Sequence, residues 1–250
     1  RLLDPPLHEF LPAESPDPAV RRRVEQLREF NPMLGCRGCR LLILHPRIAR
    51  MQARAVADAV ADRIEAGGSP RARIMIPMVS DPRELDLLRG WIEEEVASAS
   101  RSRGRRLKIP VGVMIETPRS AILAADLAAR ADFFSFGTND LTQLTLGFSR
   151  DDSGGFLDEY LQRGILRHDP FQSVEESVAA LVESAVGAAR AVRPKISCGV
   201  CGEHGGDPAS IARFQRCGLD YVSCSSFRVP AARLAAAQAR LADSALASGG

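Results

Sequence analysis

Two short apolar runs, separated by a stretch of helix-forming residues, give the clearest pattern in the chain. Residues 111–116 read Val-Gly-Val-Met-Ile-Glu, and residues 133–140 read Phe-Phe-Ser-Phe-Gly-Thr-Asn-Asp. Residues 118–128, between them, are rich in helix formers and carry a proline in the first turn. The pattern predicts a strand, a helix and a second strand, and a right-handed crossover makes the two strands parallel. Glu116 and Asp140 are therefore expected at the same edge of one sheet.

The same alternation of strands and helices continues on both sides of this unit. Strands are expected to end at Leu3, near Cys39, and at Val79, Glu116, Gly137, Cys201 and Cys224. Helices are expected over residues 19–30, 46–66, 82–99, 141–146, 173–192, from 208 onward, and over 229–245. Seven strand ends are one fewer than a (β/α)₈ barrel has. The prediction is an α/β fold, a (β/α)₈ TIM barrel truncated at its N-terminus, with its first strand missing and its second cut short. Residues 1–250 then form one partial domain. A doubly wound open sheet is the alternative, weakened because no G-x-G-x-x-G follows an early strand.

The two carboxylates at the predicted sheet edge suggest a metal site. Mg²⁺ is usually held by one or two carboxylates together with substrate oxygens. Glu116 and Asp140 coincide with a Gly-Thr-Asn sequence at residues 137–139, where catalytic groups of barrels collect. Ordinary polar strand ends that meet water would give the same pattern, so on the residues alone both explanations stay open.

Composition narrows the class of protein. The 250 residues carry 45% hydrophobic and 26% charged residues and a formal net charge of +2, which gives no general case for nucleic-acid binding. No apolar run approaches the length of a membrane span, and the first residues contain no signal-peptide core. We therefore expect a cytoplasmic protein. Because the chain starts at Arg1 rather than Met, we also expect a piece of a longer one.

Four of the six cysteines form two CxxC segments, which raises the possibility of a zinc-binding site. The pairs are Cys36 with Cys39, and Cys198 with Cys201. They lie much further apart than in a zinc ribbon. The second pair is also predicted on a strand, where residues three apart point to opposite faces. A four-thiolate zinc site is therefore disfavoured.

The chemically suggestive residues follow the predicted strands. They are Arg1, Arg37, Arg40, Glu116, Asn139, Asp140 and Cys201, with Arg150 in the polar loop 147–155. Carboxylates can hold a cation, arginines suit phosphate or carboxylate groups, and a thiol can move a proton or act as a nucleophile. The mixture predicts a small, phosphorylated anion as substrate. For Arg37 and Arg40, a surface turn with solvated arginines explains the sequence equally well.

The amino-acid sequence of several segments resembles a known family, the pyruvate, phosphate dikinases, which belong to the phosphoenolpyruvate-utilising enzymes. The resemblance is to the C-terminal phosphoenolpyruvate/pyruvate-binding domain of that family. The segments that carry the resemblance are residues 1–10, 31–41, 114–116, 133–143, 147–152, 201–206 and 218–233. They cover almost the whole chain. Phosphoenolpyruvate synthase and the phosphoenolpyruvate–protein phosphotransferase of the sugar transport system are related alternatives, although residues 201–206 and 227–230 resemble the dikinases more.

The resemblance implies a role for each candidate residue. Glu116 and Asp140 would ligate Mg²⁺, and Cys201 would be the proton donor and acceptor at the methyl or methylene carbon. The remaining implied substrate contacts are Arg1 and Arg150 for the phosphoryl group, Gly137, Thr138 and Asn139 for the substrate, and Met114 for the pocket wall. The family converts ATP, phosphate and pyruvate to AMP, diphosphate and phosphoenolpyruvate, with a phosphohistidine that carries the phosphoryl group between distant sites.

Several expectations follow from what the sequence lacks relative to this family. The phosphohistidine and ATP-binding domains are absent from these residues, so they are expected as partners, together with a homodimer, and the chain alone is expected to be inactive. Cys36 replaces the usual histidine. His204 is expected to be structural or solvent-facing rather than phosphorylated. A non-catalytic regulatory or assembly fragment is the alternative from another functional class.

Overall fold

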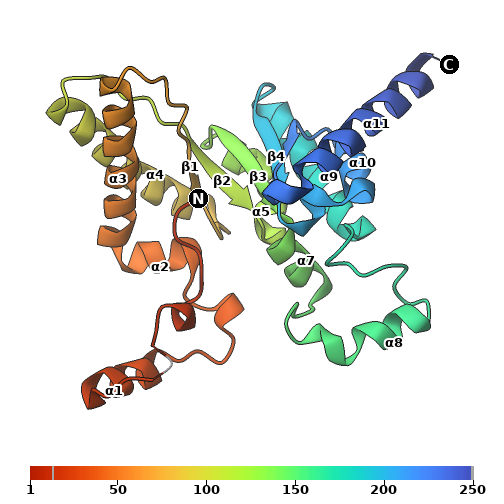
Figure 1. Cartoon of the computed structure of the whole chain (residues 1–250), viewed down its shortest axis with the longest axis horizontal. Helices are drawn as coiled ribbons and strands as arrows, with labels where there is room; N and C mark the ends of the chain where they lie inside the picture. The colour runs from red at the N-terminus through yellow and green to blue at the C-terminus, as the bar shows by residue number, and fades with distance from the viewer. Residues whose placement is uncertain (13, 249–250) are drawn as a thin grey trace. The chain divides into compact units, whose positions relative to one another are not determined.

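The structure, a computed structural model, describes residues 1–12 and 14–248. The chain divides into two compact units, Arg1–Val79 with Arg83–Gly112 and Ser80–Pro82 with Val113–Gly250. Figure 1 shows the helices and strands of both and labels most of them. The assignment of residues 1–250 to one functional domain stays a prediction.

The first unit is mainly helical. Its elements are α1 (Pro18–Leu27), α2 (Gly38–Leu44), α3 (Pro46–Glu65), β1 (Ile74–Ile76) and most of α4 (Pro82–Ser102), with short 3₁₀ turns at Leu7–Glu9 and Pro32–Leu34. Helix α3 buries alanines at positions 49, 53 and 57, a spacing of four residues that forms one narrow face. None of the ten residues of α1 is buried.

Two predicted strands in this unit do not form in the described residues. Near Cys39 the prediction was wrong, because residues 38–44 form helix α2, which buries Leu41 and Leu42 on one side. At the N-terminus, residues 1–3 run beside β1 without becoming a strand. The Leu2 N–H donates to the Met75 carbonyl over 2.9 Å, and Leu3 N–H is bound instead by the Gln52 side chain. A single ladder bond of this kind leaves the segment outside the sheet.

The second unit contains a parallel sheet with helices between its strands. Its strands are β2 (Val111–Ile115, of which the unit contains the part from Val113 onward), β3 (Phe133–Gly137), β4 (Ser197–Cys201) and β5 (Tyr221–Val222). Its helices are α5 (Pro118–Ile122), α6 (Ala124–Ala128), α7 (Thr138–Leu146), α8 (Leu157–Gln162), α9 (Glu176–Val192), α10 (Pro208–Arg216) and α11 (Val229–Ser248), with 3₁₀ turns at Ser153–Gly155, Glu203–Gly206 and Ser226–Arg228. The strand predictions at 111–115 and 133–137 are confirmed. Helix α8 was not predicted, and Figure 1 shows it apart from the strands, joined to α7 and α9 by long connections.

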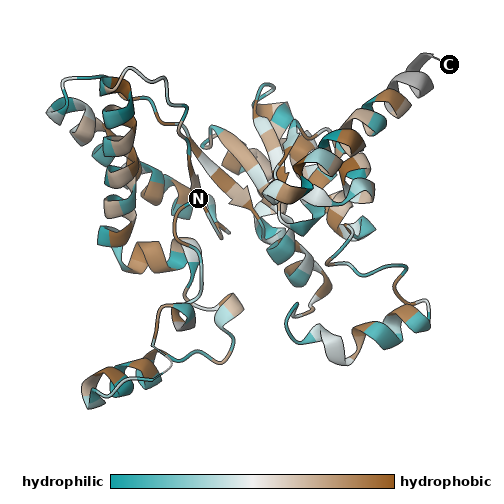
Figure 2. Ribbon diagram, viewed as in Figure 1, coloured by the Kyte–Doolittle hydropathy of each residue, from teal (hydrophilic) through white to brown (hydrophobic). Residues whose placement is uncertain are grey.

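Local sequence explains the central strand–helix–strand unit. Every residue of β2 and β3 is buried, as expected for parallel strands covered on both faces, and Figure 2 shows brown residues along β2. Thr117 then starts α5 with a capping box, in which its hydroxyl accepts from the Ser120 N–H and the Ser120 hydroxyl accepts from the Thr117 N–H. The predicted helix 118–128 is divided at Leu123 into α5 and α6, both of which pack against α9.

Strands β2, β3, β4 and β5 are parallel and pair in the order in which they occur in the sequence. An α/β fold with a parallel sheet is thus confirmed. A doubly wound sheet would need a reversal of strand order, and none occurs between β2 and β5. A small second core lies under β5, where Ile211 of α10 packs with Ala232 and Ala235 of α11.

Candidate active site

The carboxyl ends of three neighbouring strands bring the central candidate residues to one level. Ile115 of β2 pairs with Phe136 of β3, so Glu116 follows β2 beside Gly137. Gly137 in turn pairs with Cys201 of β4. The structure therefore places Glu116, Gly137 and Cys201 side by side across β2, β3 and β4, as the sequence predicted for one edge of a parallel sheet.

Gly137 is glycine because Glu116 occupies the space that a larger residue would need. A Cβ atom at Gly137 would lie 2.4 Å from Oε2 of Glu116 and 2.9 Å from Sδ of Met114. The Glu116 side chain is almost fully enclosed, with 1% of its surface exposed. Met114 and Glu116 thus close around the end of β3, and the carboxylate is held against the backbone there.

Helix α7 begins directly at the end of β3 and carries the next three candidates. Thr138 is buried, whereas Asn139 and Asp140 are partly exposed in the first turn. An acidic residue in the first turn is stabilised by the helix dipole. The Asn139 side-chain oxygen accepts from the Glu203 N–H over 3.4 Å. It also lies 2.8 Å from where a Cβ of Gly202 would stand, and Gly202 has φ of +101°. Only glycine fits both this backbone and this approach.

The two cysteines of the second CxxC segment differ sharply. Cys201 is partly exposed, its thiol lies 3.6 Å from the Phe136 carbonyl oxygen, and it lines a cavity of about 250 Å³ with Glu203, Cys224 and Arg228. Cys198 is fully buried, and burial raises the pKa of its thiol to about 11. Opposite strand faces therefore give one thiol access to a cavity and keep the other protonated in the core.

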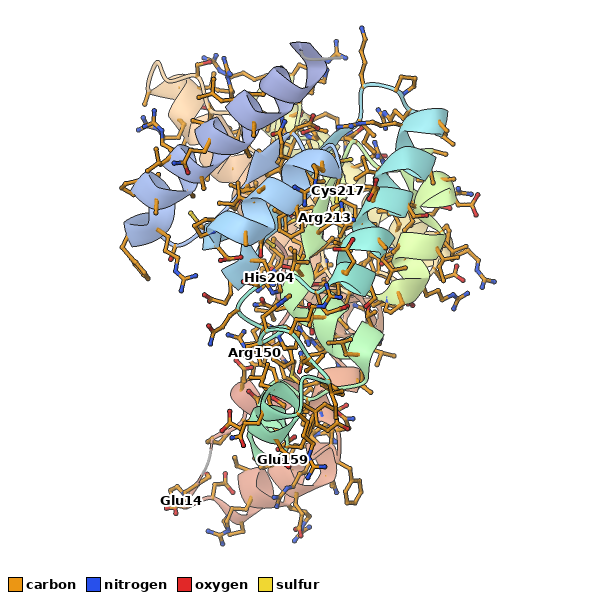
Figure 3. All side chains as sticks on the ribbon, turned by 90° about the vertical axis from the view of Figure 1, so that its right-hand side faces the viewer. Glu14, Arg150, Glu159, His204, Arg213 and Cys217 are labelled. Carbon is orange, nitrogen blue, oxygen red and sulfur yellow. The ribbon has the colours of Figure 1, made fainter. Side chains whose placement is uncertain are left out.

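Arg150 follows α7 on the polar loop and lies against a larger cavity. This cavity, of about 700 Å³, is also lined by Ser153, Asp169, Asp207 and Arg228. Figure 3 labels Arg150 with its side chain drawn. Among the described residues the Arg150 guanidinium has no ion-pair partner, while its backbone N–H is held by the Gln143 side chain over 2.8 Å. It is therefore available to an anion.

Arg1 belongs to the first unit, where a buried carboxylate holds it. Asp4 Oδ2 lies 3.1 Å from Nη1 of Arg1 and 2.8 Å from Nη2 of Arg37. Arg37 is 4% exposed, so it is not a solvated surface residue. Arg40 donates to the carbonyl groups of residues 34 and 35. Through these contacts Arg37 and Arg40 stabilise the fold of the first unit. The Arg1 side chain, in contrast, keeps 43% of its surface exposed.

Sequence reasoning missed the part that His204 plays in this region. The prediction that His204 is structural or solvent-facing is confirmed in its first half, because the side chain is completely buried. Its Nδ1 lies 2.8 Å from the Thr138 hydroxyl and its Nε2 lies 2.9 Å from the Pro170 carbonyl oxygen. Its place in a glycine-rich loop directly after a strand was the available signal.

Within the part of the chain that the structure describes, no group of three or more His, Cys, Asp or Glu side chains is arranged to hold a metal ion. A Mg²⁺ site does not need such a group, because substrate oxygens and water complete its shell. The donor set at the ends of β2 and β3 fits this requirement, since the Glu116 carboxylate is fixed in place beside Gly137 and Asp140 follows one helical turn later.

Comparisons with known proteins agree with the resemblance. A family model described as "PEP-utilising enzyme, PEP-binding domain" matches residues 1–241. The chain is 49% identical over 253 residues to pyruvate, phosphate dikinase 1, chloroplastic, of Arabidopsis thaliana, covering 95% of this chain and 26% of that protein. It is 48% identical over 255 residues to pyruvate, phosphate dikinase of Clostridium symbiosum, covering 96% of this chain and 29% of that protein. The chain thus spans less than a third of these relatives.

Among solved structures, a citrate lyase from Burkholderia xenovorans aligns with a TM-score of 0.49 and 18% identity, over 76% of this chain and 53% of that chain. In the described residues, none of the helices combines the length and the apolar character that crossing a membrane requires.

Proposed function

The chain belongs to the PEP-utilising enzymes, as their PEP-binding domain, and from this we propose that it carries the pyruvate half of a pyruvate, phosphate dikinase reaction. In that half-reaction pyruvate and phosphoenolpyruvate are interconverted, and the phosphoryl group comes from a phosphohistidine on another domain. Because the chain spans 26% and 29% of two such dikinases, the ATP-dependent half belongs to the remainder of the enzyme.

The observation that carries this proposal is the register across β2, β3 and β4. It sets a buried carboxylate (Glu116), a close backbone approach (Gly137) and a partly exposed thiol (Cys201) side by side. Removal of a proton from the methyl group of pyruvate needs an acid/base group and stabilisation of the developing enolate. Cys201 would supply the acid/base group. Glu116, held beside Gly137, would support stabilisation of the enolate.

The residues that would hold Mg²⁺ are Glu116 and Asp140. When bound, Mg²⁺ supplies Lewis-acid stabilisation of negative charge on the carbonyl oxygen of the substrate. Asn139, whose side-chain oxygen accepts from the Glu203 N–H, and Gly137 would contact the substrate. The Arg150 guanidinium would orient the phosphoryl group, for which positioning and electrostatics do most of the catalytic work.

Cys201 would move the proton between the substrate carbon and solvent. Cys201 lines a cavity together with Arg228, whose guanidinium is paired with the Glu203 carboxylate over 3.3 Å. The thiolate is the form that would accept a proton. Cys198 cannot take this role, because it is buried on the other face of β4 with a pKa of about 11.

We extend the proposal to the fold and the assembly. The consecutive order of β2 to β5 is the order in a singly wound (β/α)₈ barrel, which supports closure in the complete enzyme. Catalytic groups at the carboxyl ends of the strands suit that fold as well. A homodimer in the cytoplasm remains part of the proposal.

A chimera tests the function. The segment of the Clostridium symbiosum dikinase that aligns with this chain is replaced by the chain itself, and formation of phosphoenolpyruvate from ATP, phosphate and pyruvate is measured. The expected result is turnover that depends on Mg²⁺. A chimera that folds and binds Mn²⁺ with oxalate, a pyruvate analogue, but shows neither turnover nor exchange of the pyruvate methyl hydrogens with deuterium would instead identify a non-catalytic domain.

A further inference from the structure

His204 lies in the 3₁₀ turn that follows β4 and connects three segments of the candidate active site. Its imidazole is completely buried, and both of its nitrogens have a partner. Nε2 lies 2.9 Å from the Pro170 carbonyl, in the connection between α8 and α9. Nδ1 lies 2.8 Å from Oγ1 of Thr138, the first residue of α7. Figure 3 shows the labelled His204 above Arg150.

The Pro170 carbonyl determines which nitrogen carries the proton. A carbonyl oxygen can only accept, so Nε2 carries a hydrogen and donates it. In the neutral ring Nδ1 is then an acceptor, and it receives the hydroxyl hydrogen of Thr138. The same hydroxyl lies 3.2 Å from the carbonyl oxygen of Cys201. Since a hydroxyl has one hydrogen, Thr138 cannot donate to His204 and to Cys201 at the same time.

We propose that His204 is a positioning residue of the active site. By accepting the Thr138 hydroxyl hydrogen, it keeps this hydroxyl turned away from the Cys201 carbonyl. It thereby determines the positions of Thr138 and Cys201 at the ends of β3 and β4. The inference deepens the proposed function and rests on it for the roles of Thr138 and Cys201. It assigns no proton transfer with substrate to His204, because the ring is buried behind Thr138 and shares no hydrogen bond with Asn139 or Cys201 side chains in the described residues.

The groups around His204 shift its pKa in both directions. Burial lowers the pKa of His204 most strongly, and the positive charge of Arg150 lowers it further. The Pro170 carbonyl and the carboxylates of Asp207 and Asp169 oppose this. The neutral ring therefore prevails at neutral pH. If the ring were protonated, Nδ1–H would donate to Thr138 Oγ1, and the hydroxyl hydrogen would turn to the Cys201 carbonyl.

Nuclear magnetic resonance of the 250-residue chain tests the hydrogen-bond arrangement without any substrate. The ¹⁵N shifts of His204 at pH 7 should show the neutral Nε2–H tautomer. An Nδ1–H tautomer or an imidazolium at pH 7 would overturn the inference. This measurement does not depend on metal binding or on the proposed reaction.

Two amide substitutions then separate the two nitrogens. His204→Asn puts an amide oxygen near the position of Nδ1, so it can still accept from Thr138. His204→Gln reaches towards the position of Nε2, so it can donate to Pro170 but leaves Thr138 without its acceptor. The Cys201 carbonyl ¹³C shift should stay near the wild-type value in His204→Asn and move in His204→Gln, because the hydroxyl turns to that carbonyl. Equal movement in both variants, or movement in neither, would overturn the inference.

The same pair gives a kinetic readout in the chimera. Exchange of the pyruvate methyl hydrogens should be about tenfold slower in His204→Gln than in His204→Asn, the effect of one misdirected hydrogen bond. Affinity for Mn²⁺ with oxalate should be equal in the two. Equal losses of exchange in both variants would reduce His204 to a purely structural residue. An unsubstituted chimera without exchange would refute the proposed function, while the ¹⁵N and ¹³C results would still decide the hydrogen-bond arrangement.

Discussion

Replacement of Gly137 by alanine should lower both the stability of the fold and the affinity for metal. The loss of unfolding free energy can be worked out from the structure. The added Cβ would lie 2.4 Å from Glu116 Oε2, 2.9 Å from Glu116 Cβ and 2.9 Å from Met114 Sδ. The carboxylate end of a glutamate can rotate away, but Glu116 Cβ is attached to the backbone directly after β2, and Met114 is buried. The backbone itself is not the difficulty, because Gly137 has φ of −89°. The cost is therefore that of overpacking, about 1–3 kcal/mol of unfolding free energy.

The displaced carboxylate makes the substitution informative about function. If Glu116 is one of two protein ligands, moving it should weaken Mn²⁺ binding in the presence of oxalate by at least about tenfold, equivalent to ~1.4 kcal/mol. Urea unfolding measures the stability and a Mn²⁺ titration measures the affinity. Gly187→Ala is the matched control, because Gly187 lies within α9 with nothing within 4 Å of its added Cβ. It should raise stability by about 0.5–1 kcal/mol and leave the affinity unchanged. A Gly137→Ala protein with wild-type stability and affinity would refute the crowding argument.

Three further predictions concern single side chains. Glu116→Ala should lower the affinity for Mn²⁺ with oxalate, and an affinity equal to wild type in a titration would remove Glu116 from the site. Cys201→Ala in the chimera should abolish metal-dependent exchange of the pyruvate methyl hydrogens yet keep oxalate binding. The control Cys198→Ala should keep both exchange and oxalate binding. Exchange at the wild-type rate in Cys201→Ala would assign the acid/base role to another group. Burial raises the pKa of Cys198 from 9.0 to about 11, so the stability of the neutral thiol is fully present below pH 9 and is lost as pH rises towards 11. Unfolding free energy should fall there by up to about 1.4 kcal/mol per pH unit, and Cys198→Ala should show a shallower slope in urea titrations across this range.

The central part of the fold was predictable from the sequence because local signals agree there. The apolar runs at 111–115 and 133–136 are bounded by a proline-started helix and by polar strand ends, so period, length and flanks give one answer. The register that joins Gly137 to Cys201 follows from parallel pairing, yet the enclosure of Glu116 by Gly137 depends on side-chain packing that no spacing reveals.

The errors have a common physical origin in contacts between distant residues. The run Leu41-Leu42-Ile43-Leu44 suits a strand or a buried helix, and its helical form is anchored where the Cys39 N–H meets the Pro77 carbonyl over 3.1 Å. The burial of Arg37 likewise depends on Asp4, 33 positions away. The pairing of His204 with Thr138 and Pro170 spans 66 and 34 positions. Local pattern reading has no access to partners at such separations.

Helix α1 has a consequence for how the chain would behave towards proteases. Since none of its ten residues is buried, opening this helix exposes no core and costs little beyond its own hydrogen bonds. A helix of that length is marginal in water by itself. It carries Arg21, Arg22 and Arg23 in succession, which gives trypsin three adjacent cleavage points. Brief digestion should therefore cleave the chain within α1 first, whereas the amide hydrogens of the buried strands β2 and β3 exchange with solvent only when the sheet itself comes apart.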